Sequence, residues 1–262
     1  MENILDGTSL TTQFESAKNI LGVSHAEFVE FLQSQRYRVK MKDGGYYYEN
    51  LCVDDILEYF NLVPEDIYID AVLISHITPI IDRESFYQYG MLSLKELFRL
   101  DTPFKSFMLE FGITPLVNEN GHLKLLVNDV PKSSPYLDYR MNRDRRINGF
   151  MFNEKAEEDN NIEEMLKCPE FISKVSDELV DAWAERSRPS VITFKAFINE
   201  IDVSTISLED HTNIHTYFLH QLVERLLFVI SHYADPRNPM IYLNESVNID
   251  ANRIIGIRDV II

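Results

Sequence analysis

The 262-residue sequence predicts an α+β fold, in which helices and strands follow one another without regular alternation. An apolar run rich in β-branched residues over 67–75 is typical of a buried strand, and a hairpin is predicted over 116–127 around Asn120-Gly121. A long helix is expected within 207–233. Because these signals show no strand–helix repeat, an α+β arrangement fits better than a βαβ series.

The chain is expected to divide at about residue 65. Apolar spacing predicts helices at 12–21, 25–35 and 53–60, so residues 1–65 are interpreted as an N-terminal helical extension. Residues 66–262 are expected to form the main domain. Its predicted helices are 83–89, 93–100, 102–111, 162–167 and 169–186, and its further strands are 147–152, 190–201, 240–247 and 253–260.

The charge balance is strongly acidic, with 42 acidic and 25 basic residues and a net charge of −17. This disfavours a long groove that binds phosphates passively, since such binding requires clustered Lys and Arg. It fits solubility or a basic partner equally well. One dense basic cluster nevertheless occurs, at Arg140, Arg143, Arg145 and Arg146, so a local anion site remains open.

Several classes of protein are excluded by pattern. The sequence lacks an apolar run of about 18 residues, and its first residues lack the basic and apolar regions of a signal peptide. We therefore expect a cytoplasmic protein without a membrane partner. Cys52 and Cys168 lie far apart, which argues against a disulfide framework or a cysteine-rich zinc site.

The usual phosphate and metal motifs are missing from the sequence. It contains no Walker loop, GxGxxG, HExxH or GxSxG, and only nine glycines, so side chains must perform most of any nucleotide binding. His211 and His215 are spaced to share a helix face and could hold a metal with Asp210. Ordinary histidines on an amphipathic helix are the favoured interpretation, and we predict no metal.

A histidine follows the apolar strand directly. The run 67–75 leads into His76-Ile77-Thr78, and Pro79 cannot donate a ladder hydrogen bond, so the strand is expected to end there. Strand ends that lead into loops are common positions for functional residues. Taken alone, such a histidine is more often structural.

The order of motifs around His76 resembles the ADP-ribosyltransferase family. His76-Ile77-Thr78 matches the His-x-Thr of a first core strand, and Tyr89-Gly90-Met91-Leu92 matches a Gly-Leu-like turn, with Met91 where Leu is usual. Glu245 then lies in a late strand, 241–249, that is followed by 253–257. The resemblance covers about residues 66–262. It implies split antiparallel sheets that bind NAD, as substrate, in the cleft between them.

The same resemblance assigns roles to three residues. His76 would hydrogen-bond NAD, with the Thr78 hydroxyl beside it. Glu245 would hold the nicotinamide ribose and stabilise the positive charge that develops as nicotinamide leaves. Glu200, at the end of the strand predicted over 190–201, is the alternative catalytic carboxylate.

An aromatic ring for stacking on nicotinamide is also expected. Tyr139, beside Arg140, is the preferred candidate for the cofactor cleft, and Tyr136 is an alternative. Phe150 and Phe152 would share one face of a strand, which favours core packing for both.

Phosphate and acceptor contacts are expected from two further segments. Arg143, or alternatively Arg146, would meet the NAD pyrophosphate. The acceptor would be recognised by residues 231–244, which include Tyr233, Asp235, Arg237 and Asn238.

The resemblance is to compact bacterial intracellular members, including toxins of toxin–antitoxin and phage-defence systems. It implies a mono-ADP-ribosyltransferase for a macromolecule, with nucleic acid slightly ahead of protein, and a possible antitoxin or regulatory protein as partner. Two alternatives stay open. One is a non-enzymatic interaction protein that docks a partner through residues 1–65, and the other is a metal-dependent hydrolase that uses His211 and His215.

Overall fold

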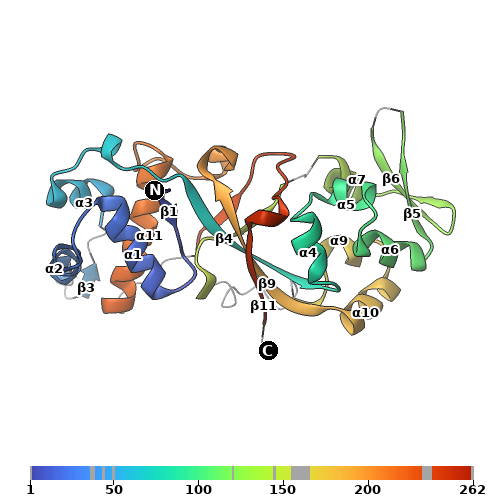
Figure 1. Ribbon diagram of the computed structural model, residues 1–262, viewed down its shortest axis with the longest axis horizontal. Coiled ribbons are helices and arrows are strands. Elements are labelled where there is room, and N and C mark those ends of the chain that lie inside the picture. The colour runs from blue at the N-terminus through green and yellow to red at the C-terminus, as the bar shows by residue number, and fades with distance from the viewer. Residues whose placement is uncertain are drawn as a thin grey trace. The chain divides into compact units, whose positions relative to one another are not determined.

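The computed structural model describes residues 2–35, 39–42, 45–48, 51–119, 121–143, 146–154, 166–231 and 238–260 (Figure 1). The chain divides into two compact units. The first comprises Met1–Leu73, Phe197–Asn199 and Val203–Pro239, and the second comprises Ile74–Ala196, Glu200–Asp202 and Met240–Ile262. The first unit thus contains the predicted extension 1–65 together with later segments.

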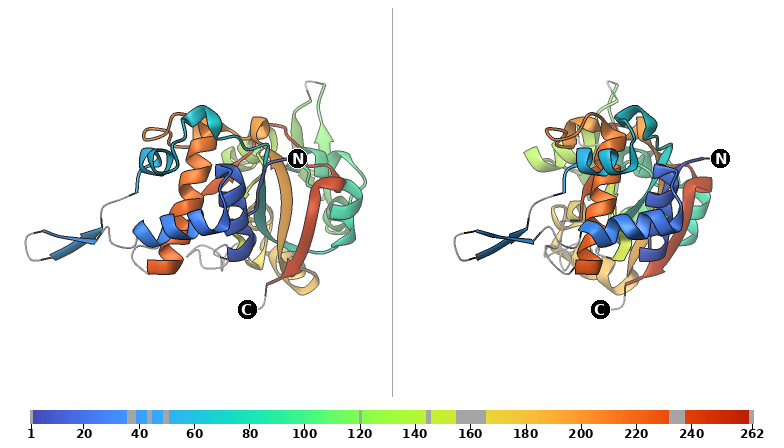
Figure 2. Two further views of the ribbon diagram at one scale, coloured as in Figure 1. Left: turned by 60° about the vertical axis from the view of Figure 1, so that its left-hand side comes forward. Right: turned by 90° about the vertical axis from the view of Figure 1, so that its left-hand side faces the viewer.

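The first unit is a small helical assembly. Its helices are α1 (Leu10–Leu21), α2 (His25–Gln35), α3 (Val53–Phe60) and α11 (Ile214–Ser231), with η1 (Pro64–Asp66) and η4 (Val203–Thr205) as short 3-10 turns. The three N-terminal helices all contact α11 (Figure 2). Ser9 caps α1 by accepting from the Thr12 amide, and Gly22 ends it at φ +68°. The predicted N-terminal helices are confirmed.

Three short strands complete this unit. β1 (Ile4–Leu5) pairs in parallel with the first two residues of β4 (Ala71–Ile80). β2 (Val39–Lys42) and β3 (Gly45–Tyr48) form an antiparallel pair.

The second unit is built on the main sheet. Its strands lie in the order β10 (Met240–Tyr242), β8 (Asn148–Phe150), β4, β9 (Arg188–Phe197) and β11 (Ile254–Asp259). β10 with β8, β8 with β4 and β9 with β11 are antiparallel pairs. The predicted α+β class with antiparallel sheets is therefore confirmed.

A three-stranded meander and several helices form a second core in this unit. The meander consists of β5 (Ile113–Val117), β6 (Leu123–Val127) and β7 (Val130–Lys132), which confirms the hairpin predicted over 116–127. The helices are α4 (Glu84–Tyr89), α5 (Leu94–Arg99), α6 (Pro103–Glu110), α7 (Pro135–Asn142), α9 (Glu170–Ser173) and α10 (Asp177–Arg186). The 3-10 turn η5 (Ala251–Arg253) also belongs to this unit, as does Glu200, the last residue of η3 (Ile198–Glu200). Buried side chains such as Phe98, Met108, Leu125, Phe171 and Trp183 join the helices to the meander.

The strand that carries His76 does not end where the sequence predicts. β4 continues through Thr78 and Pro79 to Ile80, so His76 lies within the strand. β4 pairs with β8 at Ser75, and β8 begins only at Asn148, so Pro79 lies beyond the part of β4 that β8 can pair with. A proline at this position takes no hydrogen bond away from the β4–β8 pairing.

Two late strands are also shorter than predicted. β10 ends at Tyr242, so Glu245 lies in a turn in which Val247 donates to the Asn244 carbonyl and Ser246 has φ +66°. β9 ends at Phe197, which places Glu200 in η3. Both carboxylates were expected on strands, and polar turn residues end the ladders earlier.

The helix predictions need two smaller corrections. The helix predicted within 169–186 is two helices, α9 and α10, because Ser176 begins α10 as an extended N-cap residue. α11 begins at Ile214, so His211 precedes the helix and does not share a helix face with His215. Among the helices that the structure describes, none is long and apolar enough to cross a membrane.

Candidate functional site

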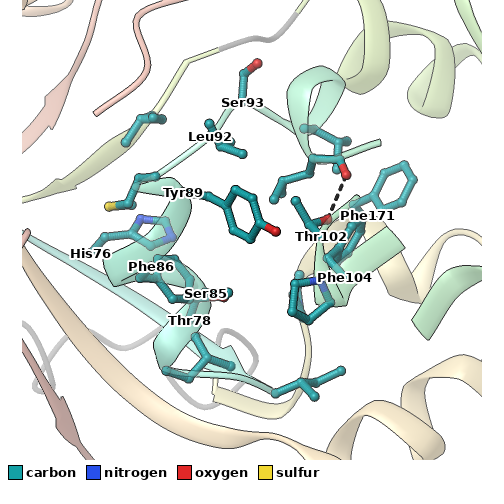
Figure 3. Close-up of a pocket in the computed structure, with 18 of the residues that line it drawn as sticks. His76, Thr78, Ser85, Phe86, Tyr89, Leu92, Ser93, Thr102, Phe104 and Phe171 are labelled. Atoms are coloured by element: carbon teal, nitrogen blue, oxygen red, sulfur yellow. Dashed lines mark hydrogen bonds between the residues drawn. The ribbon is translucent and has the colours of Figure 1, made fainter. Parts of the chain in front are cut away.

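Two adjoining hollows lie in the second unit. The smaller, called here the aromatic pocket, has a volume of about 260 Å³. Its wall contains the rings of Phe86, Tyr89, Phe104, Phe171 and Trp183. Figure 3 shows the Tyr89 ring directed into the space bordered by His76, Phe86 and Phe104. Aromatic walls of this kind suit a flat ring.

The larger, called here the cationic hollow, has a volume of about 1300 Å³. Five cationic side chains line it, against the two carboxylates Glu170 and Glu245. The cations are Arg140, Arg143, Arg146, Lys167 and Lys174. In a chain of net charge −17, this is a local reversal of sign that favours an anionic ligand.

The two hollows share part of their walls. Six residues line both of them: His76, Thr78, Arg140, Arg146, Pro169 and Glu170. A ligand with a flat ring at one end and phosphate groups at the other could therefore occupy both.

His76 has a defined tautomer. Its Nδ1 lies 2.7 Å from the Asn148 carbonyl oxygen, which can only accept, so Nδ1 carries the hydrogen. Burial lowers the pKa of His76 below the usual 6.5 of a histidine, and the bond to Asn148 offsets part of that effect. The imidazole is thus held neutral, with Nε2 as a hydrogen-bond acceptor.

The strand alternation places His76 and Thr78 on one face of β4. Ile77 between them packs with Phe150 and Val191 in a core cluster. Side chains two residues apart on a strand share a face, and both His76 and Thr78 line both hollows. The sequence-based pairing of the two residues is therefore reproduced in space.

Glu245 is connected to the same wall by an arginine. Arg146 Nη1 lies 3.0 Å from Asp202 Oδ2, and Arg146 Nη2 lies 4.0 Å from Glu245 Oε1. The Asp202 side chain is only 12% exposed, whereas that of Glu245 is 62% exposed. Asp202 thus fixes the guanidinium, and the Glu245 carboxylate remains accessible within the cationic hollow.

The turn predicted from Tyr89-Gly90-Met91-Leu92 forms part of the aromatic pocket. Met91 and Ile249 exchange two backbone hydrogen bonds of 2.9 Å, and Ser93 N–H donates to Asn248 Oδ1 at 2.8 Å. Gly90 has φ +76°, and a Cβ there would lie 1.8 Å from the Ile249 carbonyl oxygen. Only glycine permits this approach, which ties the pocket to the segment that follows Glu245.

Helix α7 presents three further predicted residues. Ser134 caps the helix and Pro135 opens it, while Arg143 donates its amide to the Tyr139 carbonyl at the C-terminal end. Tyr139 is 52% exposed and, with Arg140 and Arg143, lines the cationic hollow.

The position of α7 depends on one buried amide. Asn142 accepts from the Leu123 amide at 2.8 Å and donates to the Leu123 carbonyl at 3.0 Å. This pair of bonds fastens α7 to β6, so Asn142 helps to position Arg140 and Arg143.

The structure brings together all five residues predicted for the site. His76, Thr78, Tyr139, Arg143 and Glu245 line the cationic hollow. Their chemical roles stay a prediction.

Of the alternative candidates, Arg146 lines both hollows, whereas the others lie elsewhere in the fold. Glu200 binds Arg253 Nη1 at 2.6 Å and is not among the residues that line either hollow. Phe150 and Phe152 are buried in the core, as the sequence favours, and Tyr136 packs beside a core cluster. The predicted residues Arg145, Tyr233, Asp235 and Arg237 lie outside the described residues.

The histidines proposed as metal ligands have other partners. His211 Nε2 lies 2.9 Å from His220 Nδ1, and His220 Nε2 lies 2.7 Å from the Leu51 carbonyl. His215 Nδ1 instead accepts from the Ile69 amide at 3.2 Å. Within the described part of the chain, no group of three His, Cys, Asp or Glu side chains could hold a metal ion.

Sequence reasoning missed several wall residues. Lys167 and Lys174 join the three arginines only in the folded chain, and Phe104, Phe171 and Trp183 come from three different helices. Tyr89 was part of a predicted turn, but nothing in the sequence indicated that its ring would line a pocket.

Comparison with family models, with curated proteins and with solved structures gives no match for this chain.

Proposed function

We propose that this protein is an NAD-dependent mono-ADP-ribosyltransferase that modifies a macromolecule. The observation that carries the proposal is the shared wall of the two hollows. His76, Thr78, Arg140 and Arg146 line both the aromatic pocket and the cationic hollow. A dinucleotide has the matching chemistry, because it joins flat rings to a diphosphate.

The motif order supports NAD over other nucleotides. His76-Ile77-Thr78, the Tyr89-Gly90 turn and the late Glu245 resemble the motifs of ADP-ribosyltransferases, and all three segments line the hollows. No glycine-rich phosphate loop occurs in the sequence, so the guanidinium groups of Arg140 and Arg146 would neutralise the diphosphate instead.

The reaction we propose is a substitution at the anomeric carbon of the nicotinamide ribose. The bond from this carbon to the nicotinamide nitrogen breaks, and its electron pair leaves with neutral nicotinamide. A nucleophile of the acceptor forms the new bond and loses its proton. The exposed carboxylate of Glu245 stabilises the positive ribose in the transition state and accepts that proton.

His76 has a binding role in this proposal. Because Nδ1–H is committed to the Asn148 carbonyl, Nε2 is the free acceptor for a ribose hydroxyl. Lowering of its pKa by burial keeps the ring neutral and able to accept at neutral pH. Glu200 is less suited to catalysis, since Arg253 holds its carboxylate outside the hollows.

The test is an assay of nicotinamide release and label transfer from labelled NAD. We expect turnover by the wild type and a loss of about 100-fold or more for Glu245→Gln. His76→Ala should lose about tenfold or more, through the missing hydrogen bond. Glu185→Gln removes an exposed carboxylate on α10 that lines neither hollow, and should retain wild-type rates.

Two outcomes would contradict the proposal. Turnover that persists in both site variants would place the chemistry elsewhere in the chain. Absence of NAD consumption with protein, DNA and RNA acceptors would favour a non-enzymatic interaction protein.

A further inference from the structure

We infer that the acceptor is a single-stranded nucleic acid, whose backbone lies in the outer part of the cationic hollow. That the strand acts as the acceptor rests on the proposed NAD chemistry. Binding of the strand depends only on the cationic hollow. The outer part is defined by the residues that line the cationic hollow and not the aromatic pocket. Among them are Tyr139, Arg143, Lys167, Lys174, Tyr242 and Glu245.

The first argument is the surplus of cations. Arg140 and Arg146 line both hollows, and two guanidinium groups are enough to bind one diphosphate. Arg143, Lys167 and Lys174 lie beyond them, all exposed, and no salt bridge joins these three to a carboxylate in the described part of the chain. Three further exposed cations in one concave wall call for additional phosphates.

The second argument is the way other surface cations are used. Lys18, Arg83, Arg99, Lys105 and Arg186 each pair with a carboxylate. Some other exposed cations, such as Lys124, Lys132 and Arg188, have no salt bridge among the described residues either, but they line neither hollow. Arg143, Lys167 and Lys174 differ from them in that they gather in one wall. Glu170 and Glu245 do line the same hollow and Asp202 pairs with Arg146, so five cations stand against three carboxylates there.

The third argument concerns aromatic side chains and size. Tyr139 is 52% exposed at the wall that holds Arg143, and Tyr242 lines the wall near Glu245. Exposed rings interleaved with cations are the usual platform for single strands, since every base offers a face for stacking. The volume of about 1300 Å³ also exceeds the range of roughly 300–1,000 Å³ that is typical of small-ligand pockets.

This inference refines the sequence-based roles of Tyr139 and Arg143. Both were expected to contact NAD, but neither lines the aromatic pocket. We assign them to the acceptor, with the diphosphate left to Arg140 and Arg146. Glu245 in the same outer wall would then lie where the acceptor nucleophile arrives.

The test measures binding of fluorescein-labelled 15-nucleotide DNA and RNA single strands by anisotropy, without NAD, from 50 to 200 mM KCl. The wild type should bind single strands more tightly than a duplex of the same sequence. Arg143→Ala/Lys174→Ala should weaken binding about tenfold or more. It should also reduce the slope of log K against log salt by about 1.4, at roughly 0.7 per lost phosphate contact.

Two further variants separate stacking and general charge from the proposed contacts. Tyr139→Ala should weaken binding and leave the salt slope unchanged, because it removes stacking rather than a phosphate contact. Lys132→Ala removes an exposed cation on β7 that lines neither hollow, and should bind as the wild type does.

The inference is overturned if the wild type binds neither strand, or if Lys132→Ala weakens binding as much as the double variant. Preference for DNA or for RNA identifies the strand. Because NAD is absent, the result is separate from the proposed catalysis: turnover without strand binding would point to a protein acceptor and refute this inference alone. Strand binding without turnover would refute the transferase and leave the nucleic-acid site in place.

Discussion

His76 Nδ1 lies 2.7 Å from the carbonyl oxygen of Asn148, so a residue of β4 is locked to the first residue of β8. A carbonyl accepts only, which fixes the proton on Nδ1 and leaves Nε2 for a ligand. Because burial also lowers the pKa of His76, the neighbouring hollows contain a neutral, oriented acceptor rather than a cation.

The burial of His76 predicts a particular pH dependence of stability. Burial lowers the folded pKa of His76 below 6.5, so the unfolded chain takes up a proton first as the pH falls. The free energy of unfolding should decrease as the pH drops through about 6.5, and this contribution should level off below the folded pKa. Nitrogen NMR of the His76 ring should show the Nδ1–H tautomer and a lowered pKa.

The matched variant is His76→Gln, in which this part of the pH dependence should vanish from urea unfolding curves. A folded pKa above 6.5 would contradict the buried, neutral assignment.

Gly90 predicts a large loss of stability on substitution. Gly90→Ala would require a methyl group 1.8 Å from the Ile249 carbonyl oxygen at a positive φ, so the Met91–Ile249 pairing must break. We expect a loss of about 3 kcal/mol or more in the free energy of unfolding, measured by urea denaturation.

Gly22→Ala provides the control, because Gly22 has φ +68° but open space around it. Its cost should be about 1–2 kcal/mol, the strain alone. Equal losses of stability for the two variants would show that the close approach of Gly90 to the Ile249 carbonyl oxygen does not contribute to the cost of substitution.

The two candidate carboxylates should differ in stability. Glu200→Gln weakens a largely buried ion pair with Arg253, whose side chain is 10% exposed. The free energy of unfolding should fall by about 2 kcal/mol or more. This is less than the roughly 3–5 kcal/mol expected on breaking a fully buried pair, because Glu200 retains some exposure. Glu245→Gln should stay within about 0.5 kcal/mol of the wild type.

Thermal unfolding of both variants tests this contrast. A stable Glu200→Gln protein would remove the structural explanation for Glu200, and it would return as a candidate for catalysis.

Asn142 predicts a coupling between stability and the cationic hollow. Asn142→Ala leaves the buried amide and carbonyl of Leu123 without their side-chain partner, which should cost about 2 kcal/mol or more. Arg143→Ala, one residue later and exposed, should cost about 0.5 kcal/mol or less. Chemical denaturation compares the two.

If Arg143→Ala proved as destabilising as Asn142→Ala, its effect on strand binding would reflect unfolding and would not report a phosphate contact.

Local sequence patterns located most elements, because helix periodicity and turn chemistry act over a few residues. The N-terminal helices, the strand before His76 and the hairpin over 116–127 were all predictable in this way. Boundaries were less predictable. The extension of β4 past Pro79 and the early ends of β9 and β10 depend on which neighbouring strand is present at each position.

The sequence by itself determined the α+β class, the strand that carries His76, the turn at Gly90 and the presence of Glu245 late in the sequence. It also placed an arginine cluster in an acidic background. Only the tertiary structure decided that His76, Tyr139, Arg143 and Glu245 line one hollow, that Lys167 and Lys174 join them, and that Arg253 binds Glu200. The physical reason is that burial, ion pairing and concavity depend on residues far apart in the chain, whose contacts local patterns do not encode.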